Sequence, residues 1–504
     1  MVNIMEMEIE IKFLFSTEFE QELVETINQY NFISTNSKIL NNVYFDTPDL
    51  SLRKMHMGLR VRRSADSIEQ TIKLSGKAMG GVHQRPEYNE PLTGTHPVLS
   101  AFRDNIWPEG CDVSALEARL IPLFSTDFER RTWLLEMSDN TLIEVAYDKG
   151  SISTNTASMA LCEIELELIK GNVEQLFVVA QSIATLPQTR LSNVSKAQRG
   201  YMLADDLVFE SCALSFTPLQ PEMSLKTSLL SILQHGLAHI QYHEHCYMGN
   251  TDSKALVEVL SGIKFLHQNI KLYQPAFPHL LKANWIDDLH WLARSFSWTE
   301  SHKVNANLLE NKAIYLRKLP KSKLLVKHIQ VQNSLFPDPE KCVRILTSSR
   351  YAQFILKLTQ WLLQFEKQQI SSENDATLLQ FSSQSLTTIW NEIHVKMAHD
   401  QDLPMAHFMD NKGLFESALL TDLSFGCLFN GEDRNNYREL WLDIKQGIDA
   451  LEMLEVVSDY SEYELNKEMQ SEYMKWLQRK QDALLNALQQ SQQQALLKEA
   501  YWVL

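Results

Sequence analysis

The sequence contains no apolar run close to the roughly 20 residues that a membrane-spanning helix needs. Its first residues, MVNIMEMEIE, lack the basic start and the apolar stretch of a signal peptide. The six cysteines lie far apart and form no C-x-x-C pair, so the sequence indicates neither a disulfide framework nor a zinc site. We therefore expect a cytoplasmic protein with no membrane partner.

Basic residues are also few: 47 Lys and Arg stand against 63 Asp and Glu, a formal net charge of −16. This balance argues against a nucleic-acid partner, because such proteins need excess positive charge to meet phosphates. It does not exclude a basic pocket, since net charge does not describe a local site. At 504 residues the chain exceeds the size of one hydrophobic core, so we expect two or three domains.

The chain changes character near residue 205. Before it, β-type alternation dominates, and after Ser224 apolar residues recur with the helical period of 3.6. Between them lies FTPLQP, whose two prolines disfavour both helix and sheet. We predict an α+β protein with a β domain at 1–205, a linker at 206–222 and an all-α helical bundle at 223–504.

The β half is organised around its first strand, EIEIKF at residues 8–13. Alternation places Glu8, Glu10 and Lys12 on one face of this strand and its apolar residues on the other. The same one-sided charge recurs at 59–62, 71–73, 85–87 and 162–167. A sheet closed into a barrel, with charged faces inward and helices on its apolar outside, satisfies all of these strands together.

Such a barrel would gather acids and bases in its interior. Two carboxylates about 5 Å apart repel by roughly 3 kcal/mol at an effective dielectric constant near 20, so the acids need protons or a hard dication. Oxygen ligands alone suit Mg²⁺ or Mn²⁺ better than zinc. Arginine and lysine match phosphate oxygens, and this many bases indicate several phosphoryl groups in a row. The acids are Glu8, Glu10, Glu87, Glu144, Asp148, Glu163, Glu165 and Glu167, and the bases are Lys12, Arg60, Arg62, Lys73, Arg85, Arg130 and Lys196.

Glu8-x-Glu10-x-Lys12 resembles the ExExK signature of the triphosphate tunnel metalloenzymes, the CYTH superfamily. The similarity covers residues 1–203, and the order of the two halves is similar to that of bacterial CYTH–CHAD proteins that hydrolyse inorganic triphosphate. The matching segments are Tyr44-Phe45-Asp46-Thr47, Leu59-Arg60-Val61-Arg62, Lys73, Arg85-x-Glu87, Phe128-x-Arg130, Ile143-Glu144-x-x-x-Asp148-x-Gly150, Glu163-x-Glu165-x-Glu167 and Ser195-Lys196-x-x-Arg199-Gly200-Tyr201.

The resemblance implies an eight-stranded antiparallel tunnel with flanking helices, and it assigns roles to residues of this sequence. A general base is expected among Glu8, Glu10 and Glu165, and Lys12 joins them as a catalytic residue. Arg63, Arg131 and Cys162 have the opposite parity and are expected outside. The implied triphosphate ligands are Lys12, Arg60, Arg62, Lys73, Arg130 and Lys196, with Arg85 ranked lower; the implied Mg²⁺ or Mn²⁺ ligands are Glu8, Glu10, Asp148, Glu163 and Glu165; Glu87, Glu144 and Glu167 are further interior candidates.

The expected function is hydrolysis of inorganic triphosphate, as a small-molecule substrate, to pyrophosphate and phosphate. One alternative keeps the tunnel but hydrolyses or cyclises an organic triphosphate, such as thiamine triphosphate or ATP. That alternative requires an aromatic or apolar recess at a tunnel mouth. A third alternative is a non-catalytic polyphosphate-binding protein, against which the full set of acids argues, since binding alone needs only the bases.

The helical half is similar in layout to a CHAD domain, a family expected to bind polyphosphate on a basic surface. In the stretch 252–267, which lies nearest to the basic helix of that family, only Lys264 and His267 keep basic character. Residues 206–504 hold 28 basic and 35 acidic side chains, a net charge of −7. We therefore do not expect this half to bind polyphosphate.

Overall fold

A computed structural model describes residues 6–65, 67–310, 316, 318–369, 372–398 and 403–503. Contacts between Cα atoms group the chain into two compact units. The first consists of Met1–Glu210 and Val343–Trp361, and the second of Ser211–Cys342 and Leu362–Leu504. Within the described ranges, no helix is both long enough and apolar enough to cross a membrane.

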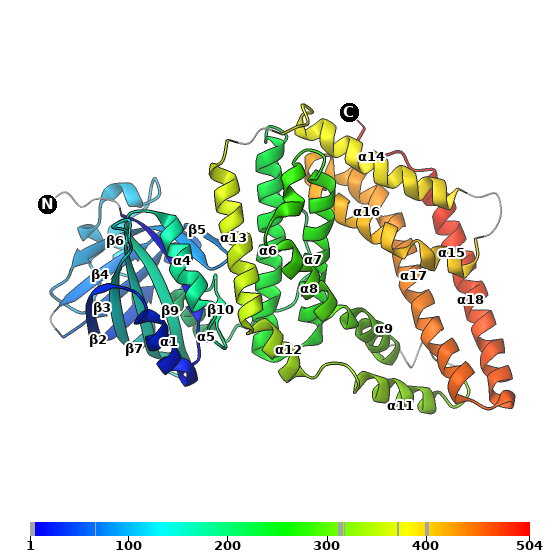
Figure 1. The fold of residues 1–504 in the computed structure, drawn as a ribbon, viewed down its shortest axis with the longest axis horizontal. Helices are drawn as coiled ribbons and strands as arrows, with labels where there is room; N and C mark the ends of the chain where they lie inside the picture. The colour runs from blue at the N-terminus through cyan, green and yellow to red at the C-terminus, as the bar shows by residue number, and fades with distance from the viewer. Residues whose placement is uncertain are drawn as a thin grey trace. The chain divides into compact units, whose positions relative to one another are not determined.

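The first unit is built on an antiparallel sheet that closes on itself (Figure 1). Its strands are β1 (Glu6–Leu14), β2 (Phe32–Asp46), β3 (Gly58–Arg63), β4 (Ile68–Lys73), β5 (Lys77–Met79), β6 (Val82–Pro91), β7 (Ile121–Glu136), β8 (Leu142–Ser153), β9 (Ser158–Lys170) and β10 (Arg190–Leu191). Eight of them follow one another in the order β1, β9, β8, β7, β2, β3, β4, β6, and pairing of β1 with β6 closes the ring. The predicted eight-stranded antiparallel barrel is confirmed.

Alternation separates the two faces of the barrel wall as predicted. On β1, Ile11 and Phe13 are fully buried on the outer side, while Lys12 between them is buried on the inner side. Helix α4 (Val173–Ile183) packs on the outside of β9 and buries Leu176 and Phe177. The apolar rows of the strands are thus covered by other parts of the unit, which leaves the charged rows facing inward.

Helix α5 (Lys196–Ala204) lies against β7 and β8 and carries interior residues of its own. Ser195 caps it, its Oγ accepting a hydrogen bond from the backbone N–H of Gln198 at 3.1 Å. At Gly200 a Cβ atom would lie 2.0 Å from the Phe124 ring, so only glycine permits this close approach. The short distance brings Lys196 to the barrel interior. The remaining short helices of this half are α1 (Glu20–Ile27), α2 (Ser51–Lys54) and α3 (Val113–Glu117).

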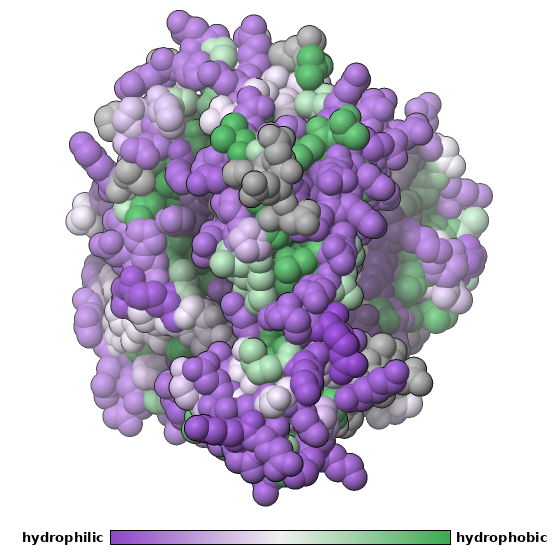
Figure 2. Space-filling model, turned by 90° about the vertical axis from the view of Figure 1, so that its right-hand side faces the viewer, coloured by the Kyte–Doolittle hydropathy of each residue, from purple (hydrophilic) through white to green (hydrophobic). Residues whose placement is uncertain are grey.

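The C-terminal part of the chain is helical, as predicted. Its helices are α6 (Leu225–Asn250), α7 (Ser253–Tyr273), α8 (Ile286–Phe296), α9 (Trp298–Glu310), α11 (Ser322–Asn333), α12 (Pro339–Leu346), α13 (Ser349–Lys367), α14 (Leu378–Met397), α15 (Met405–Asp410), α16 (Lys412–Phe425), α17 (Gly431–Glu464) and α18 (Lys467–Leu496). The face in Figure 2 is mostly hydrophilic, with apolar side chains in small groups. The large aromatic side chains, such as Trp390 and Trp441, lie buried between the helices.

Candidate active site

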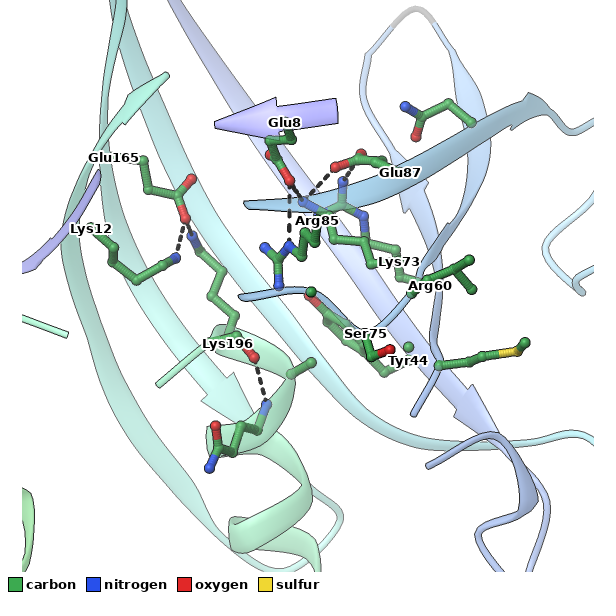
Figure 3. Close-up of a pocket in the computed structure, with 18 of the residues that line it drawn as sticks. Glu8, Lys12, Tyr44, Arg60, Lys73, Ser75, Arg85, Glu87, Glu165 and Lys196 are labelled. Carbon is green, nitrogen blue, oxygen red and sulfur yellow. Dashed lines mark hydrogen bonds and ion pairs between the residues drawn. The ribbon is translucent and has the colours of Figure 1, made fainter. Parts of the chain in front are cut away.

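The barrel encloses a cavity of about 740 Å³ whose walls are mostly charged (Figure 3). Most of the predicted interior residues line it. Those residues are Glu8, Lys12, Arg60, Arg62, Lys73, Arg85, Glu87, Arg130, Glu165, Glu167 and Lys196. Glu10, Asp148 and Glu163 are more deeply buried and contact these cavity-lining side chains.

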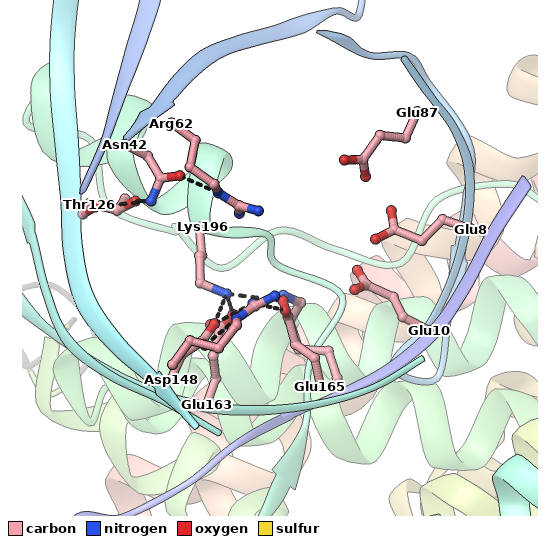
Figure 4. Close-up of polar contacts among 12 residues, drawn as sticks. Glu8, Glu10, Asn42, Arg62, Glu87, Thr126, Asp148, Glu163, Glu165 and Lys196 are labelled. Carbon is pink, nitrogen blue, oxygen red and sulfur yellow. Dashed lines mark hydrogen bonds and ion pairs between the residues drawn. The ribbon is translucent and has the colours of Figure 1, made fainter. Parts of the chain in front are cut away.

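One wall of the cavity holds three carboxylates that we call the Asp148 cluster: Asp148, Glu163 and Glu165. One oxygen from each lies within 4.8 Å of the others (Figure 4). Arg130 bonds both oxygens of Asp148, with Nε and Nη2 each at 2.7 Å, and also reaches Glu165 at 2.5 Å. This bidentate geometry fixes the planes of the arginine and Asp148 together.

Two lysines complete the charge balance of the Asp148 cluster. Lys12 Nζ lies 2.9 Å from Glu163 Oε1 and also bonds Glu165, and Lys196 Nζ lies 2.6 Å from Asp148 and 3.0 Å from Glu165. Burial alone would lower the pKa of Lys12, but the neighbouring carboxylates raise it. For Glu163, burial raises the pKa, yet the cations Lys12, Lys196 and Arg199 bring it down to about 2. Glu163 is therefore ionised at neutral pH.

Arg199 is a member of this site that the sequence prediction missed as a functional residue. It is only 7% exposed, and its guanidinium bonds Glu163. Arg199 follows Lys196 by three residues on helix α5, which places both on one helical face. This i, i+3 spacing is the sequence signal that could have identified it.

A second group, the Glu8 cluster, is formed by Glu8, Glu87, Lys73, Arg60 and Arg85 from strands β1, β3, β4 and β6 (Figure 3). Lys73 Nζ bridges Glu8 at 2.9 Å and Glu87 at 2.5 Å. Arg60 adds a contact of 3.3 Å to Glu87, and Arg85 one of 3.4 Å to Glu8. Burial raises the pKa of Glu8, whereas Lys73 and Arg60 overcome burial at Glu87 and lower its pKa.

Glu10 lies between the two clusters. It is 2% exposed, and its Oε1 accepts a hydrogen bond from Arg85 Nη2 at 3.1 Å. Burial favours the neutral acid, and so does Glu165, but Lys12, Arg85 and Lys73 outweigh both and lower the pKa of Glu10. Figure 4 shows Glu8, Glu10 and Glu87 projecting into the barrel from the same wall.

Arg62 faces the cavity with little negative charge close to it. Arg62 Nε donates to Asn42 Oδ1 at 2.8 Å, and its nearest carboxylate, Glu69, is 3.6 Å away. Burial, and next the like charges of Arg60 and Arg130, lower the pKa of Arg62 to about 10. Crowding of like charge at a buried position favours an anion there. The sequence analysis did not identify Asn42 as a site residue. Its side-chain amide is oriented by the hydrogen bond that Nδ2 donates to Thr126 Oγ1.

Glu167 has the least compensated carboxylate of the cavity. Strand pairing sets it opposite Glu10 on β1 and opposite Glu144 on β8. No ion pair to either Glu144 or Glu167 occurs among the described residues. Burial, and then the charges of Glu8, Glu144 and Glu10, raise the pKa of Glu167 to about 8. This position needs a proton or an added cation at neutral pH.

Glu167→Gln is expected to flatten the pH dependence of stability in metal-free protein. Folded Glu167 keeps its proton to about pH 8, whereas an ordinary glutamate loses it near 4.5. Between these values the folded state binds the extra proton, so the free energy of unfolding falls as pH rises. At pH 8 the variant should be more stable than the parent by about 1–2 kcal/mol, an allowance for partial solvent screening.

This difference can be measured by urea unfolding with EDTA at pH 5.5 and 8. Glu129→Gln, at an exposed position on β7, is the matched control and should leave the slope unchanged. Identical slopes for the parent and Glu167→Gln would contradict an unpaired acid at this position.

Residues of opposite parity lie outside the barrel. Arg63 is exposed, and Arg131 stacks on the ring of Trp133, with its guanidinium carbon 4.6 Å from the centroid. Cys162 contacts the hydroxyl of Tyr147, which in turn donates to Glu20 on the surface helix α1. None of these three predicted exterior residues lines the cavity.

A closed antiparallel barrel with acids and bases converging inside is the architecture of the triphosphate tunnel class that the sequence resembles. Residues 6–201 match the family model of the CYTH domain, and residues 231–410 match that of the CHAD domain. The chain therefore combines a CYTH domain with a CHAD domain.

Three proteins are each similar to part of this chain. An inorganic triphosphatase of Haemophilus influenzae is 38% identical over 204 residues, which are 40% of this chain and 56% of that protein. The chain thus spans little more than half the length of that relative. HpAC1 of Hippeastrum, described with a dominant triphosphatase activity, is 19% identical with a TM-score of 0.31, covering 39% of this chain and 95% of that one. The CHAD domain of Ricinus communis is 19% identical with a TM-score of 0.43, covering 57% and 96%.

Proposed function

We propose that this protein hydrolyses inorganic triphosphate to pyrophosphate and phosphate inside its barrel, with the help of a divalent cation. One observation carries the proposal: a single enclosed cavity presents buried cations on several walls beside clustered carboxylates. A polyanionic substrate binds to the cationic side chains, and the carboxylates hold the divalent cation and accept the proton of the attacking water. The 38% identity to an inorganic triphosphatase supports this assignment.

The donor set fits a hard divalent cation, Mg²⁺ or Mn²⁺. Oxygens of Asp148, Glu163 and Glu165 converge within 4.8 Å, and no cysteine or histidine takes part in that group. We assign Glu8, Glu10, Asp148, Glu163 and Glu165 as the residues that would hold it, with Glu144 and Glu167 as neighbours of lower rank. When bound, the cation supplies positive charge against the negative charge that develops on the transferred phosphoryl group.

The residues of the chain bind the substrate and handle its proton. Arg60, Arg62 and Arg130 face the phosphoryl oxygens, and Lys73 and Lys196 hold the ends of the chain of phosphates. The oxygen of a water attacks the terminal phosphorus, the bond to the bridging oxygen breaks, and pyrophosphate leaves. We assign the acceptor of the water's proton to one carboxylate among Glu8, Glu10 and Glu165.

Lys12 has a positioning and electrostatic role in this proposal. It is 1% exposed and contacts Glu163 and Glu165 in the cavity wall. Its charge keeps both carboxylates ionised, so that they can hold a cation. Lys12 is also one of the predicted triphosphate ligands, and with Arg85 and Glu87 it completes the lining of the cavity.

The cavity favours an inorganic over an organic triphosphate. Tyr44 and Tyr201 are the aromatic residues that line it, and both are engaged in packing. The Tyr44 ring stacks on Phe124 with centroids 4.6 Å apart, and the Tyr201 hydroxyl donates to Asp46 at 3.0 Å. Both rings are thus already used in contacts within the protein. Phosphate release from tripolyphosphate, ATP and thiamine triphosphate, compared with Mg²⁺ and Mn²⁺, tests the choice directly.

Glu10→Gln is expected to lower the turnover of tripolyphosphate by about 100-fold or more, the scale of losing one electrostatic group in a catalytic site. The amide keeps the shape and the contact to Arg85 but removes the negative charge. The measurement is phosphate release at saturating Mg²⁺, with thermal unfolding as a check on folding. Glu129→Gln, outside the barrel, should behave like the parent. Near-normal turnover of a folded Glu10→Gln variant would show that Glu10 has no role in the active site.

We also propose that the catalytic half corresponds to residues 1–205, followed by a linker at 206–222 and the helical half at 223–504. The helical half carries a net charge of −7, so a polyphosphate-binding role is not part of the proposal. Nucleic acid and membranes are likewise not among the partners that we assign.

A further inference from the structure

The helical unit contains a second cavity, of about 410 Å³, that has no part in the barrel chemistry. It lies between α7, α8 and α16, and we call it the α8 pocket. Its walls are largely apolar, formed by Ile263 from α7, Leu289 from α8 and Leu420 from α16. A volume of this size and an apolar lining are typical of sites for small organic molecules, which occupy about 300–1,000 Å³.

Three charged residues line the α8 pocket: Lys264, Arg294 and Glu416. Lys264 Nζ pairs with Glu416 Oε2 at 2.8 Å and with Glu300 Oε1 at 2.6 Å, so its charge is already neutralised within the protein. Arg294 is exposed on the rim and forms no ion pair within the described parts of the chain. Its positive charge is therefore available to bind an anionic ligand, although residues 206–504 as a whole are acidic.

Two histidines stand beside Arg294 at the same rim. His267 of α7 and His290 of α8 meet through their Nε2 atoms at 3.2 Å, with ring centroids 5.2 Å apart. One imidazole donates and the other accepts, and the pair ties the two helices together across the rim. The rings add flat, partly polar edges next to the guanidinium, which suits a planar acidic group.

These features select the class of ligand. An inorganic polyphosphate has no apolar part to pack against Ile263, Leu289 and Leu420. A neutral lipid has no negative charge to pair with Arg294. Burial of an apolar body stabilises a complex by about 25 cal/mol per Å², and a charge at the rim fixes its orientation. We propose that the α8 pocket binds a small organic anion, with an apolar ring system seated between α7, α8 and α16 and one acidic group at Arg294.

A matched pair of dyes tests both halves of this proposal on the full chain. 1-Anilinonaphthalene-8-sulfonate has an apolar ring body and one sulfonate, and N-phenyl-1-naphthylamine has the same body without charge. Tripolyphosphate without a divalent cation is included to occupy the barrel. We expect one sulfonate dye to bind per chain, more tightly than the neutral dye.

Two variants that fill the pocket locate the binding site. A Cβ atom at Gly413 would meet no heavy atom within 4 Å, so Gly413→Phe should be accepted by the fold, and Ala293→Trp fills the pocket from α8. Each should weaken both dyes at least about tenfold in Kd. Ala483→Trp, at an exposed alanine of α18, is the control and should change neither.

Arg294→Gln separates charge from apolar burial. We expect it to weaken the sulfonate dye about fivefold to tenfold and to leave the neutral dye unchanged, the scale of one charge-assisted contact. Arg479→Gln makes the same charge change at an exposed site of α18 and should have no effect. Dye binding that survives both filling variants would overturn the site, and equal affinities of the two dyes would overturn the anionic ligand. These outcomes do not depend on whether the barrel hydrolyses triphosphate.

Discussion

EDTA is expected to abolish phosphate release from tripolyphosphate, and excess Mg²⁺ or Mn²⁺ is expected to restore it. The cavity gathers Glu8, Glu10, Glu165 and Glu167 beside the buried Asp148 and Glu163. A triphosphate brings further negative charge into this space, and Glu167 already lacks a cation. Loss of a divalent charge from such a site removes several kcal/mol of transition-state stabilisation, which is about 1,000-fold or more in rate.

The barrel itself is expected to stay folded in EDTA. Each carboxylate of the Asp148 cluster already contacts Lys12, Arg130, Lys196 or Arg199, so folding does not depend on the added charge. Circular dichroism and thermal unfolding with and without EDTA provide the check. Sustained hydrolysis in buffer freed of divalent cations would contradict the proposed role of the acids. Loss of folding together with activity would show that the cation is structural.

The barrel could be predicted because its pattern is local and repeats. Alternation on a strand has a period of two, so each strand by itself separates an inner from an outer row. In β1, the register of Lys12 between Ile11 and Phe13 already follows from the sequence. Closure followed from requiring every strand to bury one apolar row, and pairing of Glu10 with His83 on β6 is the register that achieves it.

The pairing of charges could not be predicted in the same way. Alternation places a side chain inside the barrel but does not say which of several opposite charges it contacts. That choice depends on the shear of the barrel and on helix α5, which enters from outside the strand pattern. Arg199 was therefore recognised in a matching segment but given no role, although it shares a helical face with Lys196. The lack of an ion pair at Glu167 could not be predicted either, because it results from the nearby cations pairing with other carboxylates.

The α8 pocket illustrates a third limit. It is formed by α7 and α8 together with α16, which lies more than a hundred positions further along the chain. Periodicity predicts that each helix has an apolar face but not that three faces leave a gap between them. The sequence analysis identified Lys264 and His267 only as the residues that keep basic character in the stretch 252–267. In the structure one belongs to an ion pair and the other to a histidine pair.

The arginine strand β3 offers the sharpest test of the inward and outward rows. Arg60→Ala and Arg62→Ala are each expected to cost about 2–4 kcal/mol of transition-state stabilisation, roughly 30-fold to 1,000-fold in kcat/KM. Both are buried and line the cavity. Arg62 is crowded by the like charges of Arg60 and Arg130, which an incoming triphosphate would balance, whereas Arg60 also contacts Glu87. Folding should survive, because Glu87 keeps Lys73 when Arg60 is lost, and Arg62 has Asn42 as its main partner.

Arg63→Ala is the matched control for both variants, one residue further along the same strand. Its side chain is exposed on the outer face, so kcat/KM for tripolyphosphate should change by less than about twofold. Steady-state kinetics with Mg²⁺ on the three purified variants makes the comparison, and urea unfolding separates catalytic from structural loss. Equal losses at all three positions would mean that the charge of the strand acts as a whole and that its two faces are not distinct. A loss confined to Arg60 and Arg62 places the substrate inside the barrel, on the inward row.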